Sequence, residues 1–476
     1  MRGGGWDASA NRVGVRPPPS GALRVLAVGG VVIVAGALAL AGCGDDRPGA
    51  DEREVARLPA SPTPALDLLL VIDDSPGLVE AQFALVQALP GVLDALEAET
   101  GGALDLHLGV VTTDLGTLDA TGAIGATLGQ PGNGGCAGSG DDGALQVFGA
   151  PITGAFLVDA PADGGRRRNY TGDRATVIQQ MVTGAGAGGC GFEQPLAAMR
   201  RALVHPANAG FRRPGAHLAV VLLADEDDCS LLDHGLVDAA RTELGPLQSF
   251  RCTREGVTCD QPLTEAGVKT GCRASETSAF VEGLAGFEDA LRAEVADAAE
   301  LTVIAMIGDP SSVEIELRVP PGGDTPQLAL AASCRWTGDN GVVVADPGVR
   351  LAGLAGRFGS RGFVESLCGD APTAITARLA GVLAAPLAGR ACLDTAVLHD
   401  VAHDAPGVQP RCTVEEGAPG ESPVVLPQCP AAGTCYDLIV DAEACPDEGA
   451  LRLAITRTTP AAAGAVISAR CELALE

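Results

Sequence analysis

Acidic and hydroxylic side chains cluster at three places, each beside a segment expected to be regular. Residues 73–75 (Asp-Asp-Ser) follow the apolar run 66–72, and residues 225–228 (Asp-Glu-Asp-Asp) follow the apolar run 218–223. A third cluster, residues 189–193, ends in a glutamate and precedes an amphipathic segment. Carboxylate and hydroxyl oxygens are the ligands that hard cations such as Mg²⁺ prefer. The three clusters could hold a divalent cation if the fold brings them to one edge.

Short apolar runs and helical periods alternate along most of the chain. Four continuous apolar runs predict strands buried on both faces of a sheet: 66–72, 106–112, 218–223 and 301–307. Apolar positions at three- and four-residue intervals predict helices over 79–96, 194–204, 276–298 and 372–387. This alternation predicts an α/β fold with a doubly wound, mostly parallel sheet. In such sheets ligands bind outside the carboxyl ends of the strands, where residues 73–75 and 225–228 are expected.

Three segments do not follow the alternation. We expect residues 116–172, which are rich in Gly and Asp, to form a long surface excursion, and residues 229–272, with four cysteines, to form a disulfide-stapled insertion. Residues 341–345 have no evident role, and residues 362–364 suggest an edge strand. The α/β domain is assigned to residues 65–389. Residues 390–476 contain six cysteines and short alternating runs, which predicts a small disulfide-rich β domain.

The start of the sequence has the pattern of an export signal. Residues 23–42 are almost wholly apolar, follow several arginines and end in Leu40-Ala41-Gly42-Cys43. Residues 1–42 are therefore expected to be a lipoprotein signal peptide, with Cys43 as the lipidated residue. The alternative is a retained membrane-spanning helix, because about 20 apolar residues suffice to cross a bilayer. Residues 43–64, rich in charged residues, Pro and Ala, are expected to be a flexible spacer.

Cysteine usage indicates an oxidising compartment. Without Cys43, fourteen cysteines remain, eight before residue 390 and six after it, so each group can pair internally. We expect Cys136 to pair with Cys190 and Cys334 with Cys368, and connectivity elsewhere stays open. Zinc binding is disfavoured because no CxxC pair occurs and the six histidines are scattered.

The charge balance restricts the class of partner. The chain has a formal net charge of −28, and nucleic acids and anionic lipid headgroups both need cationic surfaces. We therefore expect no nucleic-acid partner, and membrane attachment only through the lipid anchor, on the outer or inner membrane, facing the periplasm or the cell surface.

Three strand-and-loop motifs carry a resemblance to a known family. Residues 71–75, residues 109–114 and residues 221–230 resemble the corresponding segments of von Willebrand factor type A domains. They are more closely similar to the von Willebrand A-like lipoproteins encoded in myxobacterial genomes, in which residues 191–194 (Gly-Phe-Glu-Gln) also have a counterpart. The resemblance covers about residues 64–390.

The resemblance implies a metal-ion-dependent adhesion site built from an Asp-x-Ser-x-Ser run, a threonine and a later aspartate. Asp73 and Ser75 match the first two positions and Asp225 matches the later aspartate. Gly77 replaces the second serine, and no threonine falls at the expected place near residue 190. Glu193 or Thr113 could supply an oxygen instead.

A purely structural interpretation stands beside the metal site. Aspartates that follow a strand often cap the next helix or form a turn. Asp227 and Asp228 are expected to form a solvated acidic loop.

The function expected from these features is binding. An anchored adhesion-type module would recognise a protein or cell-envelope partner through Mg²⁺ or another divalent cation. The alternative is a structural envelope lipoprotein whose site has lost its metal. An enzyme is not expected, because the sequence contains no GxSxG, HExxH or phosphate-binding loop.

Overall fold

The structure is a computed structural model. It describes residues 52–474 except for residues 76, 320–323, 339–341, 369–371, 390, 403–406, 442–444, 446–448, 450 and 463. The predicted signal peptide, Cys43 and the first part of the spacer lie outside the described residues.

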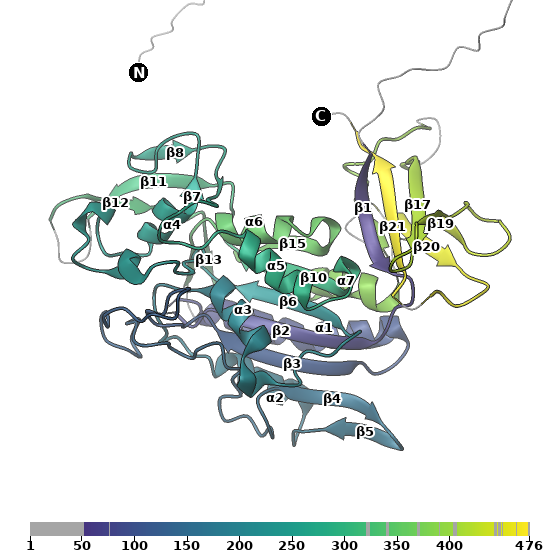
Figure 1. Cartoon of the computed structure of the whole chain (residues 1–476), viewed down its shortest axis with the longest axis horizontal. Coiled ribbons are helices and arrows are strands. Elements are labelled where there is room, and N and C mark those ends of the chain that lie inside the picture. Colours follow the sequence, from purple (N-terminus) through teal and green to yellow (C-terminus); the bar gives the residue numbers. More distant parts are fainter. Residues whose placement is uncertain are drawn as a thin grey trace, which may run out of the picture. The chain divides into compact units, whose positions relative to one another are not determined.

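A mostly parallel sheet forms the centre of the molecule (Figure 1). Within the described residues it has seven strands, in the order β15-β10-β6-β2-β3-β4-β5. The strands are β2 (Ala65–Ile72), β3 (Asp105–Thr112), β4 (Leu157–Ala162), β5 (Gly165–Arg168), β6 (His217–Leu223), β10 (Leu301–Ile307) and β15 (Gly362–Ser366). The run from β15 to β3 is parallel, whereas β4 and β5 pair antiparallel at one edge. The mixed α/β class and the four buried strands predicted from the apolar runs are confirmed.

Helices cover both faces of this sheet because the central strands are apolar on both sides. In β2, Leu68 and Leu70 belong to one core and Leu69 and Val71 to the other. The first core includes residues of α1 (Val79–Thr100), α2 (Arg174–Thr183) and α7 (Pro372–Ala388). The second includes residues of α3 (Pro195–Val204), α5 (Ala285–Ala293) and α6 (Val349–Gly356).

Two sequence expectations for this domain need correction. The segment 116–172 is not only a surface excursion, because it contains β4 and β5, which extend the sheet. The predicted helix 276–298 is too long, since α5 covers only its middle. Before α5 the backbone pairs with the loop after β6, through Leu232 N to Phe280 O (2.7 Å) and Glu282 N to Ser230 O (2.9 Å).

Shorter elements decorate the central domain. Around the cysteine-rich insertion lie α4 (Phe250–Gly256), β7 (Val257–Thr258), β8 (Gly267–Lys269), β9 (Arg273–Ala274), β11 (Val313–Arg318) and β12 (Gln327–Leu330). From the apolar run at 341–345, the described residues Val342–Ala345 form strand β14, which pairs with β13 (Cys334–Thr337) in a hairpin. Single 3-10 turns are η1 (Pro206–Asn208), η2 (His234–Val237), η3 (Thr242–Leu244), η4 (Ala298–Glu300) and η5 (Gly359–Arg361).

The C-terminal part is built from two small antiparallel sheets. Their strands are β16 (Ala391–Leu393), β17 (Cys412–Gly417), β18 (Val424–Val425), β19 (Cys435–Val440), β20 (Leu451–Thr456) and β21 (Val466–Glu472). One sheet also contains β1 (Glu52–Pro59), which pairs with β21 (Figure 1). The prediction of a flexible spacer over 43–64 is therefore wrong for residues 52–59. Ala56 and Leu58 are buried in the core of this sheet, which holds the strand in place.

Each of the seven disulfides joins two cysteines on the same side of residue 390. Four lie before it, Cys136–Cys190, Cys229–Cys252, Cys259–Cys272 and Cys334–Cys368. Three lie after it, Cys392–Cys445, Cys412–Cys471 and Cys429–Cys435. The structure thus contains both pairs expected from the sequence, and each cysteine group pairs internally.

Candidate functional site

The first two acidic clusters meet at the carboxyl ends of adjacent strands. Asp73 follows β2 and Asp225 follows β6, and these strands are parallel neighbours with Ile72 beside Leu223. The Asp73 amide donates to the Leu223 carbonyl at 2.9 Å. The carboxyl groups of Asp73 and Asp225 are near enough for each to shift the pKa of the other. The parallel register therefore brings two loops, distant in sequence, to one point.

Both aspartates are buried with oxygen atoms that have no partner. Asp73 Oδ1 accepts from the Ser75 amide at 2.7 Å, but Asp73 Oδ2 and Asp225 Oδ1 accept no hydrogen bond. Burial raises the pKa of Asp73, and burial together with the Asp73 charge raises the pKa of Asp225 well above its usual value. Two carboxylates in contact without a donor between them repel each other unless a proton or a cation lies there.

Glu193 adds a third buried carboxylate to this edge. Its side chain is 1% exposed, and neither carboxylate oxygen has a hydrogen-bond partner. Burial raises the pKa of Glu193 well above its usual value, and the nearby charges of Glu226, Asp73 and Asp225 raise it further. Glu193 precedes α3, so a third loop contributes to the same cluster.

Thr113 lies between the Asp73 and Glu193 loops. Its amide donates to the Ile72 carbonyl at 3.1 Å, and its carbonyl accepts from the Gln194 amide at 3.1 Å. The Thr113 side chain is fully buried and its hydroxyl has no partner. The end of β3 therefore places an unpartnered hydroxyl beside the loops that carry the two carboxylates.

Gly77 occupies the place of the second serine for a steric reason. Its φ is +136°, and a Cβ atom there would lie 3.0 Å from Asp225 Oδ2. A serine would be strained by the backbone and crowded by the aspartate. Glycine therefore replaces the serine of the family motif at a place where the turn approaches Asp225 closely.

Glu226, which the sequence placed in the acidic run 225–228 but not among the candidate ligands, is also a member of this cluster. Burial, followed by the charge of Asp73, raises the pKa of Glu226 to about 7, and Glu226 Oε2 is buried without a partner. Its position directly after Asp225 was the available signal. Asp74 also differs from an ordinary turn residue, because burial and the charges of Asp114, Asp73 and Asp141 raise its pKa to about 8.

These side chains fit a divalent cation by their chemistry. The main groups that shift the pKa of Glu193, Asp225 and Glu226 include no arginine or lysine, and none of these carboxylates forms an ion pair with a described residue. Their carboxylate oxygens do not come together three at a time within 4.8 Å. The donor set that fits is therefore two carboxylates, Asp73 and Asp225, completed by hydroxyls and water, a combination suited to Mg²⁺.

Away from the acidic edge, one group in the part of the chain that the structure describes does bring three possible metal ligands together. Ligand atoms of Asp119, Asp233 and His234 lie within 4.8 Å of one another. Asp119 Oδ1 already accepts from the Thr121 and Ala123 amides, and His234 Nδ1 lies 2.6 Å from Asp119 Oδ2. These contacts satisfy the cluster as a loop anchor.

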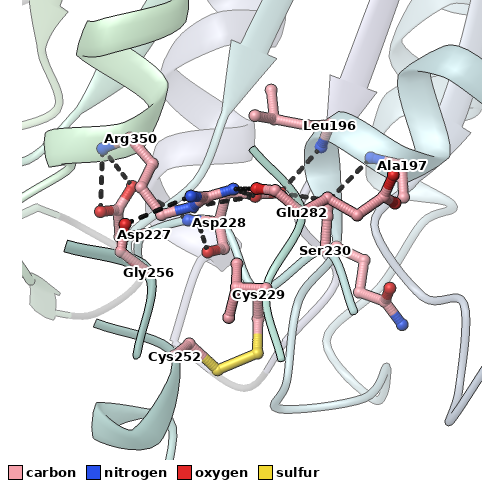
Figure 2. A network of polar contacts seen from close by, with 12 residues as sticks. Leu196, Ala197, Asp227, Asp228, Cys229, Ser230, Cys252, Gly256, Glu282 and Arg350 are labelled. Carbon is pink, nitrogen blue, oxygen red and sulfur yellow. Dashed lines mark hydrogen bonds and ion pairs between the residues drawn. A yellow bond between two sulfur atoms is a disulfide. The ribbon is translucent and has the colours of Figure 1, made fainter. Parts of the chain in front are cut away.

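The aspartates after Asp225 are structural. Asp227 is 5% exposed, and its carboxylate accepts from the Arg350 amide at 2.9 Å (Figure 2). It also accepts from the Leu351 amide at 3.2 Å, so it bonds to the first turn of α6. Asp228 is fully buried and pairs with Arg350 Nη2 at 2.8 Å. The prediction of a solvated acidic loop is therefore wrong.

The same loop also caps α3. Asp228 Oδ1 accepts from the Leu196 amide at 3.1 Å and from the Ser230 hydroxyl at 2.6 Å, and Ser230 Oγ accepts from the Ala197 amide at 2.8 Å (Figure 2). The adjacent Cys229 is bonded to Cys252. Residues 227–230 thus hold the backbone of the loop whose first residue is Asp225.

Comparison with known proteins gives distant structural likenesses. No family model matches the chain, and no curated protein matches it. A von Willebrand factor type A structure from Catenulispora acidiphila is 10% identical, with a TM-score of 0.28, covering 89% of this chain and 66% of that chain. The pilus adhesin SpaC from Lactobacillus rhamnosus GG is 9% identical, with a TM-score of 0.29, covering 87% of this chain and 40% of that chain. Such low scores do not establish a common fold.

Proposed function

We propose that this protein is an exported, lipid-anchored binding module in which Asp73, Ser75 and Asp225 hold a divalent cation. The observation that carries the proposal is the set of buried, unpartnered oxygens that three loops bring to the carboxyl ends of β2, β3 and β6. Taking such groups out of water without partners costs free energy, and a bound cation offsets that cost.

The topology supports a von Willebrand factor type A-like, doubly wound domain. The chain passes from β2 to β3 on one side and later adds β6, β10 and β15 on the other, so the strand order switches direction at β2. Helices lie on both faces. Ligand sites of doubly wound sheets lie at such a switch point, which is the position of Asp73 and Asp225.

The partner that suits this site is a carboxylate-bearing protein or envelope component. The chain has a net charge of −28 and would repel an acidic ligand, whereas a divalent ion reverses the sign of the local potential. An ion held by two carboxylates and hydroxyls keeps coordination positions for an external oxygen. The site would then bind rather than catalyse.

Calorimetric titration of the full-length, disulfide-intact protein with Mg²⁺ and Mn²⁺ tests the cation. Asp73→Asn should weaken binding by about tenfold or more, since one charged ligand is lost. Asp94→Asn is the matched control, because the side chain of Asp94 is 77% exposed on α1, and it should bind like the wild type. Equal affinity in all three proteins would remove the cation from the proposal.

A metal-free scaffold is the second candidate function. Gly77 in place of a serine is the observation that favours it. A chelator should then leave the melting temperature unchanged, whereas a bound ion stabilises the native state and its removal lowers that temperature.

The lipid anchor at Cys43 is part of the same proposal. It is supported by the sequence Leu40-Ala41-Gly42-Cys43 at the end of an apolar run. Labelled palmitate should enter the wild-type protein and not Cys43→Ser, and label in both would place the lipid elsewhere. The proposed location is the cell envelope.

A further inference from the structure

A second polar site lies near the amino ends of the parallel strands, whereas the acidic cluster lies at their carboxyl ends. A cavity of about 550 Å³ is lined by residues that precede β10 and β15 and by side chains of β1. Its arginines are Arg57, Arg292, Arg357 and Arg361, and its acidic residues are Glu54 and Asp297. An arginine-rich cavity is unexpected in a chain that contains 60 acidic and 32 basic residues. It therefore calls for a physical explanation.

Three of the four arginines are neutralised by carboxylates. Arg57 forms a two-pronged pair with Asp297, with Nε to Oδ1 at 2.9 Å and Nη2 to Oδ2 at 2.7 Å. Arg292 and Arg357 both bond to Glu288 at 2.9 Å. The charges of Arg57, Arg292 and Arg357 are therefore balanced within the fold. Arg361 is the remaining arginine of the cavity.

Arg361 has no such partner among the residues that the structure describes. The residue is 4% exposed, and its Nε and Nη1 atoms are buried without any hydrogen-bond partner. Burial lowers the pKa of Arg361 to about 10, against the opposing charge of Glu54. A buried guanidinium is costly unless its donors are paired, and fixed donors of this kind match oxyanions. Arg361 therefore lines the cavity and carries buried donors that no described residue satisfies.

We propose that this cavity binds the phosphate group of a small phosphomonoester, with Arg361 as the anchoring residue. A tetrahedral phosphate has enough oxygens to bond Arg361 and also contact the neighbouring guanidiniums, whereas one carboxylate is matched by a single guanidinium fork. The cavity volume lies within the range of small-molecule sites and exceeds what an inorganic phosphate ion fills. The rest of the ligand would occupy the remaining space.

The cavity depends on the N-terminal strand. Glu54 and Arg57 of β1 line it, and the Arg57–Asp297 pair joins β1 to the segment just before β10. Ligand binding would therefore strengthen the attachment of β1 to the central domain. This site is independent of the proposed cation site, because its residues in the central domain precede β10 and β15, whereas those of the cation site follow β2 and β6.

Calorimetry on the full-length, disulfide-intact protein tests the site with glycerol 3-phosphate, inorganic phosphate and acetate at equal ionic strength. We expect glycerol 3-phosphate to bind more tightly than inorganic phosphate, and acetate to bind weakly or not at all. Arg361→Met should weaken phosphate binding about tenfold or more, and Arg361→Lys should weaken it less, since it keeps the charge and loses the fork. Arg318→Gln, an exposed arginine paired with Glu316 on β11, is the control and should bind normally.

A melting curve without ligand separates a ligand-binding role from a structural one. Arg361→Met removes an unpaired buried charge, so the free protein should melt at the same temperature as the wild type or higher. A lower melting temperature for Arg361→Met together with unchanged phosphate affinity would make Arg361 structural and overturn the proposal. Absence of any phosphate binding to the wild type would also overturn it. Acetate binding as tight as phosphate would reject the phosphate class.

Discussion

At the scale of single residues, the acidic edge of the sheet is distinguished by buried carboxylate oxygens that have no hydrogen-bond donor. Asp73, Glu193 and Asp225 are buried, carry oxygens without donors, and have pKa values raised by burial. Gly77 permits the close packing of these acidic residues, because any side chain at position 77 would contact Asp225. The missing serine is therefore coupled to the close packing of the site rather than independent of it.

Restoring the serine of the family motif should harm the protein. Gly77→Ser places a side chain at φ +136° and against Asp225 Oδ2, which should lower the free energy of unfolding by about 1–3 kcal/mol without improving Mg²⁺ affinity. Urea unfolding and calorimetry measure the two quantities. Gly102→Ser is the control, since a Cβ there meets nothing within 4 Å. Tighter Mg²⁺ binding at unchanged stability would show that the turn can accept the usual ligand.

At the scale of elements, one loop performs two tasks. Its first residue, Asp225, belongs to the acidic edge, while Asp227 and Asp228 bond to the first turns of α6 and α3. The Asp228–Arg350 pair at its centre has both side chains fully buried. Positioning of Asp225 is thus linked to the packing of two helices on one face of the sheet.

Breaking this buried pair from one side should be costly. Asp228→Ala leaves the Arg350 guanidinium buried without its carboxylate and should lower the free energy of unfolding by about 3–5 kcal/mol. The double variant Asp228→Leu/Arg350→Met removes both charges and should be less destabilised than Asp228→Ala alone. Urea unfolding with intact disulfides provides the comparison. A double variant as unstable as the sum of its single variants would show that the two residues act independently.

At the scale of the whole molecule, buried carboxyl groups should make stability fall toward alkaline pH. Burial raises the pKa of Asp74 and Asp346 to about 8 and that of Glu226 to about 7, whereas unfolded carboxyls titrate near pH 4. Between these values the folded state holds protons that the unfolded chain has released. The free energy of unfolding therefore decreases as pH rises through this interval.

The effect is cleanest above about pH 6.5. Below that value two buried histidines, His107 and His217, act in the opposite direction, because burial lowers their pKa values and they charge only on unfolding. From about pH 6.5 to 8, each retained proton should lower the free energy of unfolding by about 1.4 kcal/mol per pH unit in chelator. Saturating Mg²⁺ should reduce this slope, because a bound cation favours the ionised form of the carboxyl groups around it. Urea unfolding across this range measures it, and stability that rises with pH in chelator would contradict the prediction.

Local sequence pattern determined the central sheet and the position of two site residues. The continuous apolar runs specified β2, β3, β6 and β10, because a strand buried on both faces must be apolar throughout. Asp73 and Asp225 follow two of those runs directly, so their meeting at one edge follows from parallel pairing. The even cysteine counts on either side of residue 390 likewise matched the disulfide groups.

Tertiary structure alone decided the features that depend on a distant partner. Strand β1 exists because β21, at the far end of the chain, offers it an edge and a core. Asp228 is buried rather than solvated because Arg350 pairs with it, whereas two buried nitrogens of Arg361 find no hydrogen-bond partner among the described residues. The local sequence around an acidic or basic residue does not show whether its side chain is solvated, paired or unpaired. Only the tertiary structure determines whether an opposite charge lies beside a given charged residue.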